Sequence, residues 1–147
     1  KLKSLYARTN LLVINKEGSE RILGLPEKGG DISVLLEKVH ALGPKSVIIT
    51  DERNGAYAYD GKEKLFIPMY PDSREPVERT GAGDAFASTV TCALALGKPF
   101  REALLWGPIN SMAVVQKIGA QAGLLSRAQI EQYLKDAPST YTVTSLS

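Results

Sequence analysis

A run of small residues followed by an acid is the part of the sequence whose residue types could do chemistry. Gly81, Ala82 and Gly83 allow a sharp turn and a close backbone approach to a ligand, and Asp84 follows directly. Residues 85–96 carry apolar side chains at helical spacing, so the turn is expected to lead into a helix. The unpaired N–H groups and the dipole at a helix start favour an anion such as phosphate. A carboxylate beside that anion could take the proton of a hydroxyl group during phosphoryl transfer.

The same pattern has a simpler interpretation, a glycine-rich helix start in which Asp84 only caps the helix. Short glycine motifs often occur by chance, so a lone Gly-x-Gly-Asp would favour that interpretation. The longer string Thr-Gly-Ala-Gly-Asp-Ala-Phe, residues 80–86, closely resembles the C-terminal signature of the ribokinase-like (PfkB) carbohydrate kinases. The similarity extends on both sides of the signature, over about residues 11–134.

The resemblance implies ATP-dependent phosphorylation of a sugar or a sugar-like hydroxyl, with Mg²⁺ as the metal. It implies that Asp84 is the catalytic base and that the backbone amides of Gly81, Ala82 and Gly83 form the anion hole. Thr80, Gly81 and Gly83 are expected to contact the nucleotide.

One further segment matches the family's phosphate and magnesium site only in part. The family carries Asn-x-x-Glu at a strand end, and its Asn and Glu help to order phosphate and Mg²⁺. Here Asn15 matches, whereas Gly18 stands at the Glu position. Glu17 and Glu20 lie nearby, but neighbours on a helix point in different directions and do not simply substitute. For Asn15 alone, capping of the next helix is an equally good interpretation.

A second partial match concerns the turn that lies along the nucleotide in the family, Thr-x-Gly-x-x-Gly. Thr50 and Gly55 match this pattern, and Glu52 replaces the middle glycine. A Glu side chain there would point to solvent or crowd the nucleotide, and its charge would repel phosphates. As an isolated motif this is a plain turn between two strands.

Two more residues are candidates through the resemblance. Glu78 stands where the family usually has Asp, an acid associated with a monovalent-cation site in some relatives, so dependence on K⁺ is open. Asn110, in the predicted helix 100–117, is a weak candidate for a contact to the nucleotide. The alternative for Asn110 is a helix Asn bonded to a neighbouring backbone group. Residues 118–121 resemble the family's Gly-Ala turn, which flanks the nucleotide and cation sites.

The order of the predicted elements indicates an α/β fold. A strand, a helix and a second strand in this rhythm predict a parallel sheet with a right-handed crossover. The expected fold class is ribokinase-like α/β, a largely parallel sheet flanked by helices in three layers (α/β/α). Residues 1–137 are expected to form the C-terminal nucleotide-binding portion, and the Ser- and Thr-rich residues 138–147 a tail. The predicted strands are 11–14, 46–50, 55–59 and 65–70, and the predicted helices 16–24, 32–42, 85–96, 100–117 and 127–135.

Composition excludes several classes of function. The net charge is +2 and Lys and Arg are scattered, which argues against nucleic-acid or membrane-surface binding. No apolar run is long enough to span a bilayer, and we expect a cytoplasmic protein. The single cysteine, Cys92, excludes an internal disulfide, and with one histidine, His40, a zinc site is not expected.

Alternatives to a sugar kinase stay open at this point. Members of the family are considerably longer than 147 residues, so the N-terminal half, which carries most sugar contacts, is expected to be missing here. A non-catalytic nucleotide- or sugar-binding module of the same fold would explain Gly18 and Glu52. A kinase of a nucleoside or a vitamin-like alcohol is the third possibility. The expected partners are ATP and a small molecule, and homodimer formation is open.

Overall fold

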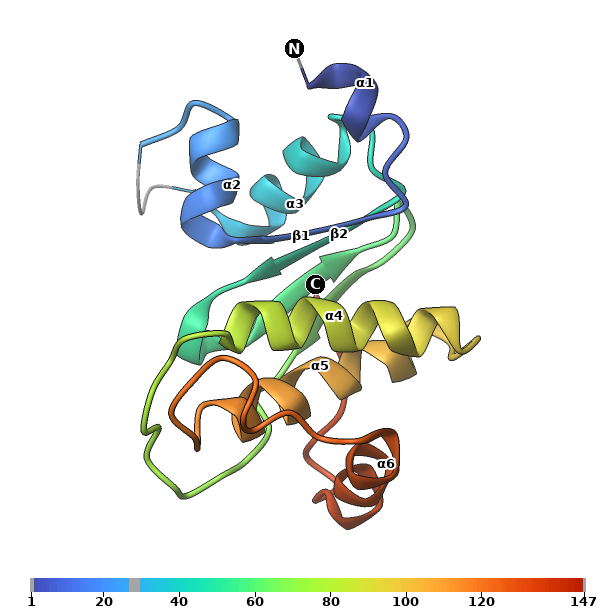
Figure 1. The fold of residues 1–147 in the computed structure, drawn as a ribbon. Coiled ribbons are helices and arrows are strands. Elements are labelled where there is room, and N and C mark those ends of the chain that lie inside the picture. The colour runs from blue at the N-terminus through green and yellow to red at the C-terminus, as the bar shows by residue number, and fades with distance from the viewer. Residues whose placement is uncertain (1, 27–29, 147) are drawn as a thin grey trace. The chain divides into compact units, whose positions relative to one another are not determined.

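The computed structural model describes residues 2–26 and 30–146, which form two compact units. The first unit comprises residues 1–67 with 144–147, and the second comprises residues 68–143. Figure 1 labels α1–α6, β1 and β2. The first unit contains α1 (Lys3–Tyr6), β1 (Leu11–Asn15), α2 (Lys16–Ile22), α3 (Ile32–His40), β2 (Ser46–Thr50), the 3₁₀ turn η1 (Glu52–Asn54), β3 (Ala56–Tyr59), β4 (Lys64–Ile67) and β5 (Thr144–Ser145). The second contains α4 (Ala82–Ala95), α5 (Phe100–Val114) and α6 (Arg127–Asp136).

The sheet of the first unit has the strand order β1-β2-β3-β4-β5, with β1 at one edge. Strand β1 runs parallel to β2, and the other three pairs of the described strands are antiparallel. The sheet is therefore mixed, where the sequence predicted a largely parallel one. The link from β1 to β2 contains two helices and is long enough for a parallel crossover, whereas the links from β2 to β3 and from β3 to β4 are short turns.

The hydrophobic core of the first unit lies between α3 and the sheet. Leu35, Leu36 and Val39 of α3 are fully buried against Val47 and Ile49 of β2. Helices α2 and α3 lie beside β1 and β2, as Figure 1 shows. This packing fixes the direction of β1 and β2, so their carboxyl ends meet at one edge, where Asn15 pairs with Thr50.

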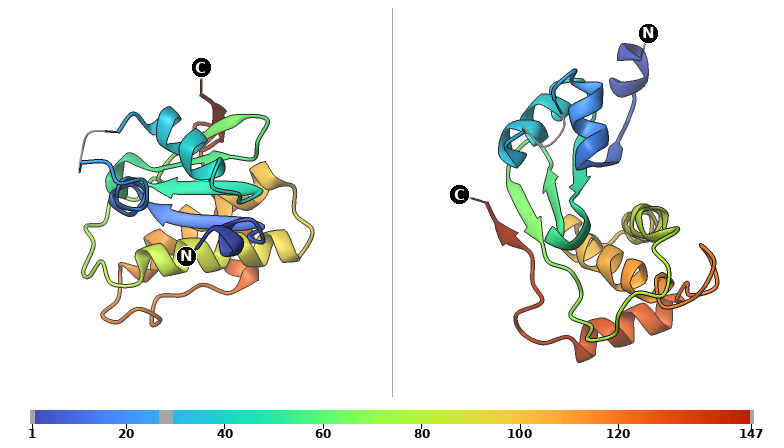
Figure 2. Two further views of the ribbon diagram at one scale, coloured as in Figure 1. Left: turned by 90° about the horizontal axis from the view of Figure 1, so that it is seen from above. Right: turned by 90° about the vertical axis from the view of Figure 1, so that its left-hand side faces the viewer.

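The second unit is organised around α4 and α5, which pack against each other and lie next to each other in both views of Figure 2. Gly107 makes their close approach possible, since a Cβ atom there would lie 2.8 Å from the ring of Phe86 and 2.9 Å from Val90. Helix α6 packs against α5 and begins with a capping box formed by Ser126 and Gln129.

The expectation of a tail from residue 138 onward is wrong. Tyr141 and Val143 are buried, and the Tyr141 hydroxyl donates a 2.6 Å hydrogen bond to the carbonyl of Leu105. Residues 144–145 form β5, which pairs with β4. The composition of the segment suggested a tail, but two apolar side chains spaced by two residues are enough to anchor an extended segment.

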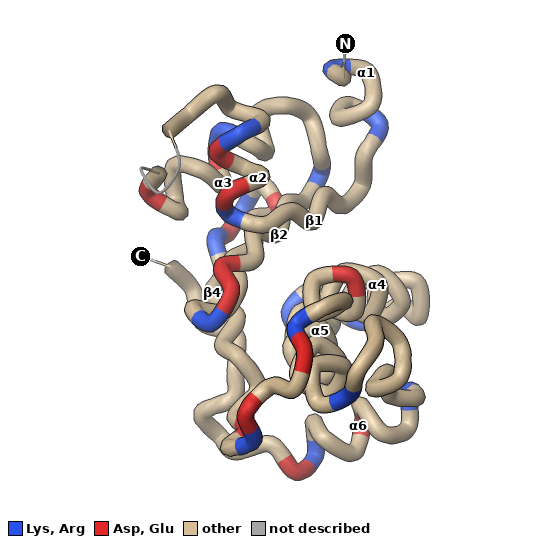
Figure 3. The backbone as a smooth tube through the Cα atoms, turned by 60° about the vertical axis from the view of Figure 1, so that its left-hand side comes forward, with Lys and Arg blue, Asp and Glu red and all other residues tan. Residues whose placement is uncertain are grey.

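Charges of both signs alternate along the backbone in Figure 3, without a long run of either. Within residues 2–26 and 30–146, none of the helices combines the length and the apolar character that crossing a membrane requires.

Candidate active site

The signature turn of the second unit is made by one residue, Gly81. Its backbone is left-handed, with φ +85° and ψ −3°, and it is the N-cap of α4. A Cβ atom at this position would lie 2.8 Å from backbone and side-chain atoms of Ala120, so both conformation and space require glycine. The helix begins at Ala82 rather than at the predicted residue 85, because Ala82 and Gly83 already belong to its first turn.

This early start decides which amides are open. The Ala82 N–H donates to the carbonyl of Arg79 at 3.3 Å, and the Ala85 N–H begins the helical ladder at 2.8 Å from the Gly81 carbonyl. In the described part of the chain, no acceptor meets the N–H of Gly81, Gly83 or Asp84. Two of the three predicted anion-hole amides are therefore free, and the amide of Asp84 joins them. The sequence already places Asp84 in the first helical turn, where N–H groups lack an intrahelical partner, but only its carboxylate was given a role.

The carboxylate of Asp84 is exposed and sits in the same helical turn as these amides. Among the described residues it makes no ion pair and no hydrogen bond. Thr80, also exposed, lies immediately before the turn. The second unit thus brings Thr80, the open amides and Asp84 together within one short segment.

Glu78 lies two residues before Thr80 and holds a second segment. Its carboxylate Oε2 accepts a 2.7 Å hydrogen bond from the N–H of Gly119. The N–H groups of Val77 and Glu78 both donate to the carbonyl of Val115, at 2.8 and 3.2 Å. The hydrogen bond from Gly119, followed by one from the Thr80 side chain, lowers the pKa of Glu78 below its ordinary value.

Asn110 is buried, with 6% of its surface exposed. Its Nδ2 donates to the Thr89 hydroxyl at 2.7 Å, and its Oδ1 accepts from the N–H of Leu125 at 2.9 Å. Both ends of the side-chain amide are therefore used inside the second unit. This geometry favours the alternative of a helix Asn bonded to neighbouring groups, and we leave Asn110 out of the proposed site.

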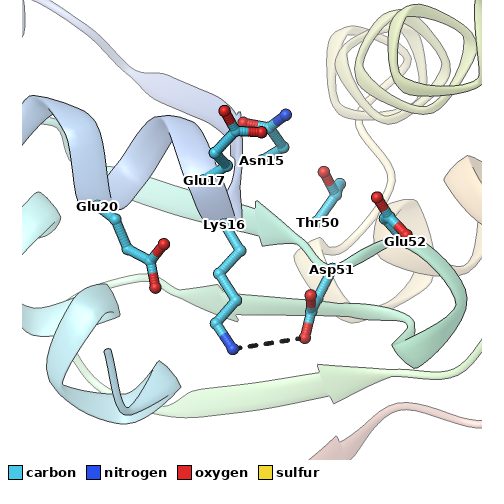
Figure 4. A pocket seen from close by; sticks show the side chains of 7 residues that line it. All are labelled: Asn15, Lys16, Glu17, Glu20, Thr50, Asp51 and Glu52. Carbon is cyan, nitrogen blue, oxygen red and sulfur yellow. Dashed lines mark ion pairs between the residues drawn. The ribbon is translucent and has the colours of Figure 1, made fainter. Parts of the chain in front are cut away.

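The first unit carries a pocket of about 390 Å³ at the carboxyl ends of β1 and β2 (Figure 4). Asn15 and Thr50 come together there, on adjacent strand ends. The Asn15 side chain folds back as the N-cap of α2 and accepts the Gly18 N–H at 2.8 Å. A Cβ at position 18 would lie 2.7 Å from Asn15 Oδ1, so any larger residue there would displace this cap. The lining residues are Asn15, Lys16, Glu17, Glu20, Thr50, Asp51 and Glu52.

Neither neighbouring acid substitutes for the missing Glu at position 18. Glu17 pairs with Arg21 at 2.6 Å, and Glu20 is buried and accepts the N–H of Gly30 at 3.3 Å. In Figure 4 the Lys16 side chain extends toward Asp51, and the two charged groups are 3.9 Å apart. The pocket therefore carries more negative than positive charge.

In the turn after β2, Glu52 stands where the family pattern has its middle glycine, and its backbone keeps a conformation that favours glycine. Glu52 has φ +46° and is the only non-glycine residue with positive φ among those described. Gly55 has φ +92°, and a Cβ there would lie 2.5 Å from the carbonyl oxygen of Ile67. Gly55 is thus required for chain geometry and does not line the pocket, whereas Thr50 and Glu52 do.

Comparison with known proteins gives these sites a context. Residues 1–127 match the family described as "pfkB family carbohydrate kinase". A ribokinase of Bacillus subtilis is 36% identical over 94 residues, which cover 64% of this chain and 31% of that protein. A cytidine kinase of Thermococcus kodakarensis is 29% identical over 120 residues, which cover 80% of this chain and 41% of the relative.

Among solved structures, the ribokinase of Arabidopsis thaliana complexed with ribose and ATP superposes with a TM-score of 0.81 at 27% identity. The match covers 90% of this chain and 43% of that one. The ribokinase-like α/β fold class predicted from the sequence is confirmed. The chain spans less than half the length of each of these three relatives.

Proposed function

This chain belongs to the pfkB family of carbohydrate kinases, and we propose that it is the nucleotide-binding and catalytic-base portion of an ATP-dependent kinase. The acceptor is a hydroxyl group of a sugar or a sugar-like small molecule. The observation that carries the proposal is the start of α4, where open amides and the exposed Asp84 carboxylate share one helical turn. Anion donors beside an available base are what phosphoryl transfer to a hydroxyl needs.

In the proposed reaction, the acceptor oxygen attacks the γ-phosphorus of ATP. A new phosphorus–oxygen bond forms, the bond from γ-phosphorus to the β-phosphate oxygen breaks, and ADP leaves. Asp84 takes the hydroxyl proton on a carboxylate oxygen. The N–H groups of Gly81, Gly83 and Asp84 donate to the transferring phosphoryl group, where a well-placed donor contributes about 3 kcal/mol. The Ala82 amide donates to Arg79 instead and serves by shaping the turn.

The proposed nucleotide ligands of the first unit are Asn15 and Thr50, with Gly55 shaping the turn behind them. Those of the second unit are Thr80, Gly81 and Gly83. Mg²⁺, when bound with ATP, would neutralise part of the phosphate charge. The described residues contain no group of three or more acids or other metal-ligating side chains that could enclose a metal. Mg²⁺ uses one or two carboxylates plus substrate phosphates, and in the pocket Glu52, with Asp51 beside it paired to Lys16, would supply them.

A monovalent cation at Glu78 fits this chain poorly. The carboxylate already accepts the Gly119 N–H at 2.7 Å, and the Thr80 side chain donates to the same group. The carboxylate is thus already engaged by two hydrogen-bond donors. We assign no step of the reaction to K⁺.

The variant Asp84→Asn tests the proposed function in the complete kinase. Removal of the base should lower kcat by about 100- to 10,000-fold, while the dissociation constant for MgATP changes little. A coupled assay for ADP release measures the first quantity and calorimetry measures the second. Asp136→Asn, an exposed acid at the end of α6, is the matched control and should retain full activity. Near-normal turnover by Asp84→Asn would remove Asp84 from the mechanism.

An ADP-release assay over a panel of acceptor molecules decides between a sugar kinase, a kinase of another alcohol and a non-catalytic binding module. It should contain sugars and nucleosides, because a cytidine kinase is among the relatives. A non-catalytic module, favoured by Gly18 and Glu52, would bind ATP and ADP in calorimetry but release no ADP with any acceptor. Turnover with one class of acceptor would identify the kinase and its substrate class together.

A further inference from the structure

The loop that follows α5, residues 115–125, is largely exposed, but hydrogen bonds hold it at its start, its middle and its end. At its start, the Val115 carbonyl accepts the N–H groups of Val77 and Glu78. In its middle, the Gly119 N–H donates to the Glu78 carboxylate. At its end, the Leu125 N–H donates to the buried Asn110. Val77 and Glu78, just before the signature, therefore hold the loop at two of these three places.

The same loop touches the signature turn itself. The Cα, Cβ and carbonyl oxygen of Ala120 each lie 2.8 Å from the place where a Cβ of Gly81 would stand. Ala120 follows Gly119 directly, so the residue held by Glu78 adjoins the residue that packs on Gly81. Any shift of the loop must therefore reach the turn whose amides open toward the proposed phosphate.

We propose that Glu78 is a positioning residue whose carboxylate clamps the 115–125 loop onto the Gly81 turn directly, without a cation between them. The proposal rests on the proposed function for its consequence, which is that the clamp fixes the direction of the Gly83 and Asp84 amides. Hydrogen bonds from an amide to a carboxylate are stronger than those between neutral groups, so one such bond can hold a short exposed loop.

Amide hydrogen exchange in the 147-residue chain tests the clamp without any ligand. In the unaltered chain, NMR should show the Gly119 amide protected. Glu78→Ala should speed its exchange at least about 10-fold, since one hydrogen bond to a charged group is lost. Glu78→Gln keeps an acceptor oxygen and should retain most of the protection. Glu75→Ala, an exposed acid of the same connector, is the matched control and should change nothing.

The pattern along the chain separates a clamp from a general loss of stability. For Glu78→Ala, faster exchange should be confined to the loop and the signature turn, while the α5 core amides keep their rates. Unchanged exchange at Gly119, or equal acceleration throughout the second unit, would overturn the proposal. The measurements are repeated in KCl and in tetramethylammonium chloride at equal ionic strength. A direct clamp gives the same protection in both salts, and protection that requires K⁺ would also overturn it.

Calorimetric titration with MgATP then tests the consequence for the site. Glu78→Ala should raise the dissociation constant by about 10-fold, the effect of one charge-assisted hydrogen bond, and Glu78→Gln should restore most of the affinity. Unchanged affinity in Glu78→Ala, with Gly119 deprotected, would overturn the positioning role. Failure of the unaltered chain to bind MgATP would instead count against the proposed function, and the exchange data would still decide the clamp.

Discussion

At the scale of single residues, Glu52 shows a conflict between side chain and backbone. The turn after β2 keeps a left-handed conformation at a position occupied by glutamate, with φ +46°. A non-glycine residue pays about 1–2 kcal/mol for such a conformation. The same side chain adds negative charge to a pocket that already holds Glu17, Glu20 and Asp51.

The variant Glu52→Gly should therefore raise the free energy of unfolding by about 0.5–1 kcal/mol. Relief of the left-handed strain, about 1–2 kcal/mol, is partly offset by about 0.5–1 kcal/mol for the greater freedom of glycine in the unfolded chain. Urea unfolding of the 147-residue chain measures the change. Glu52→Ala removes the charge but keeps the strained backbone, so it should not stabilise. Equal stabilisation by both variants would assign the effect to charge.

The residue scale also shows what the sequence could reveal of the site. The residue types at 80–84 predicted a glycine turn at the start of a helix, and the structure has such a turn at Gly81, but which amides are open depends on where the helix begins. The orientation of Asn15 and Asn110 could not be read in the same way. Asn15 caps α2 through the Gly18 N–H, which was one of the two interpretations left open, whereas the partners of Asn110, Thr89 and Leu125, are brought to it by packing.

At the scale of elements, the contact of α4 with α5 depends on Gly107. Gly107→Ala places a Cβ 2.8 Å from Phe86 and should destabilise the protein by about 1–3 kcal/mol through overpacking. Gly83→Ala is the matched control for stability, because no atom lies within 4 Å of a Cβ there. Alanine in that first helical turn should be neutral or stabilise by up to about 1 kcal/mol. Urea unfolding should therefore separate the two variants, and a stable Gly107→Ala variant would contradict the close packing.

Most helices and strands were predictable from the sequence, whereas the ends of several elements and the strand directions in the sheet were not. Strand β2 was predicted at its observed bounds, and the predicted starts of the helices at residues 32 and 127 match the observed starts of α3 and α6. The start of α4 was set too late because glycine lowers helix propensity, although Gly83 lies inside the helix. The mixed sheet follows from short links between strands, a feature that apolar patterns alone do not report.

At the scale of the whole molecule, the C-terminal segment contributes to the folded state through Tyr141. Its hydroxyl donates a hydrogen bond to the carbonyl of Leu105 in α5. Burial, and to a lesser extent Tyr70, raises the pKa of Tyr141 above its ordinary value. The folded protein therefore keeps this phenol neutral at pH values where the unfolded chain ionises it.

Tyr141→Phe should lower the free energy of unfolding at neutral pH by about 1–2 kcal/mol, because the hydrogen bond from the buried Tyr141 to the Leu105 carbonyl is lost. In the unaltered chain, stability should fall as the pH rises above about 10, where the unfolded tyrosine ionises, and the variant should lose less there. Thr142→Ala, an exposed neighbour, is the control and should match the unaltered chain at every pH. Identical pH profiles for all three proteins would contradict this role of Tyr141.

Strand β1 stands at the border of the sheet, and no described strand pairs with its outer side. Its sequence, Leu-Leu-Val-Ile-Asn, is of the kind that usually has neighbours on both sides. A bare margin of this composition can template the addition of another chain, and it has no Lys or Pro of its own to discourage that. Aggregation of the isolated chain on concentration or storage will therefore depend on the exposed edge of β1 more than on the modest net charge.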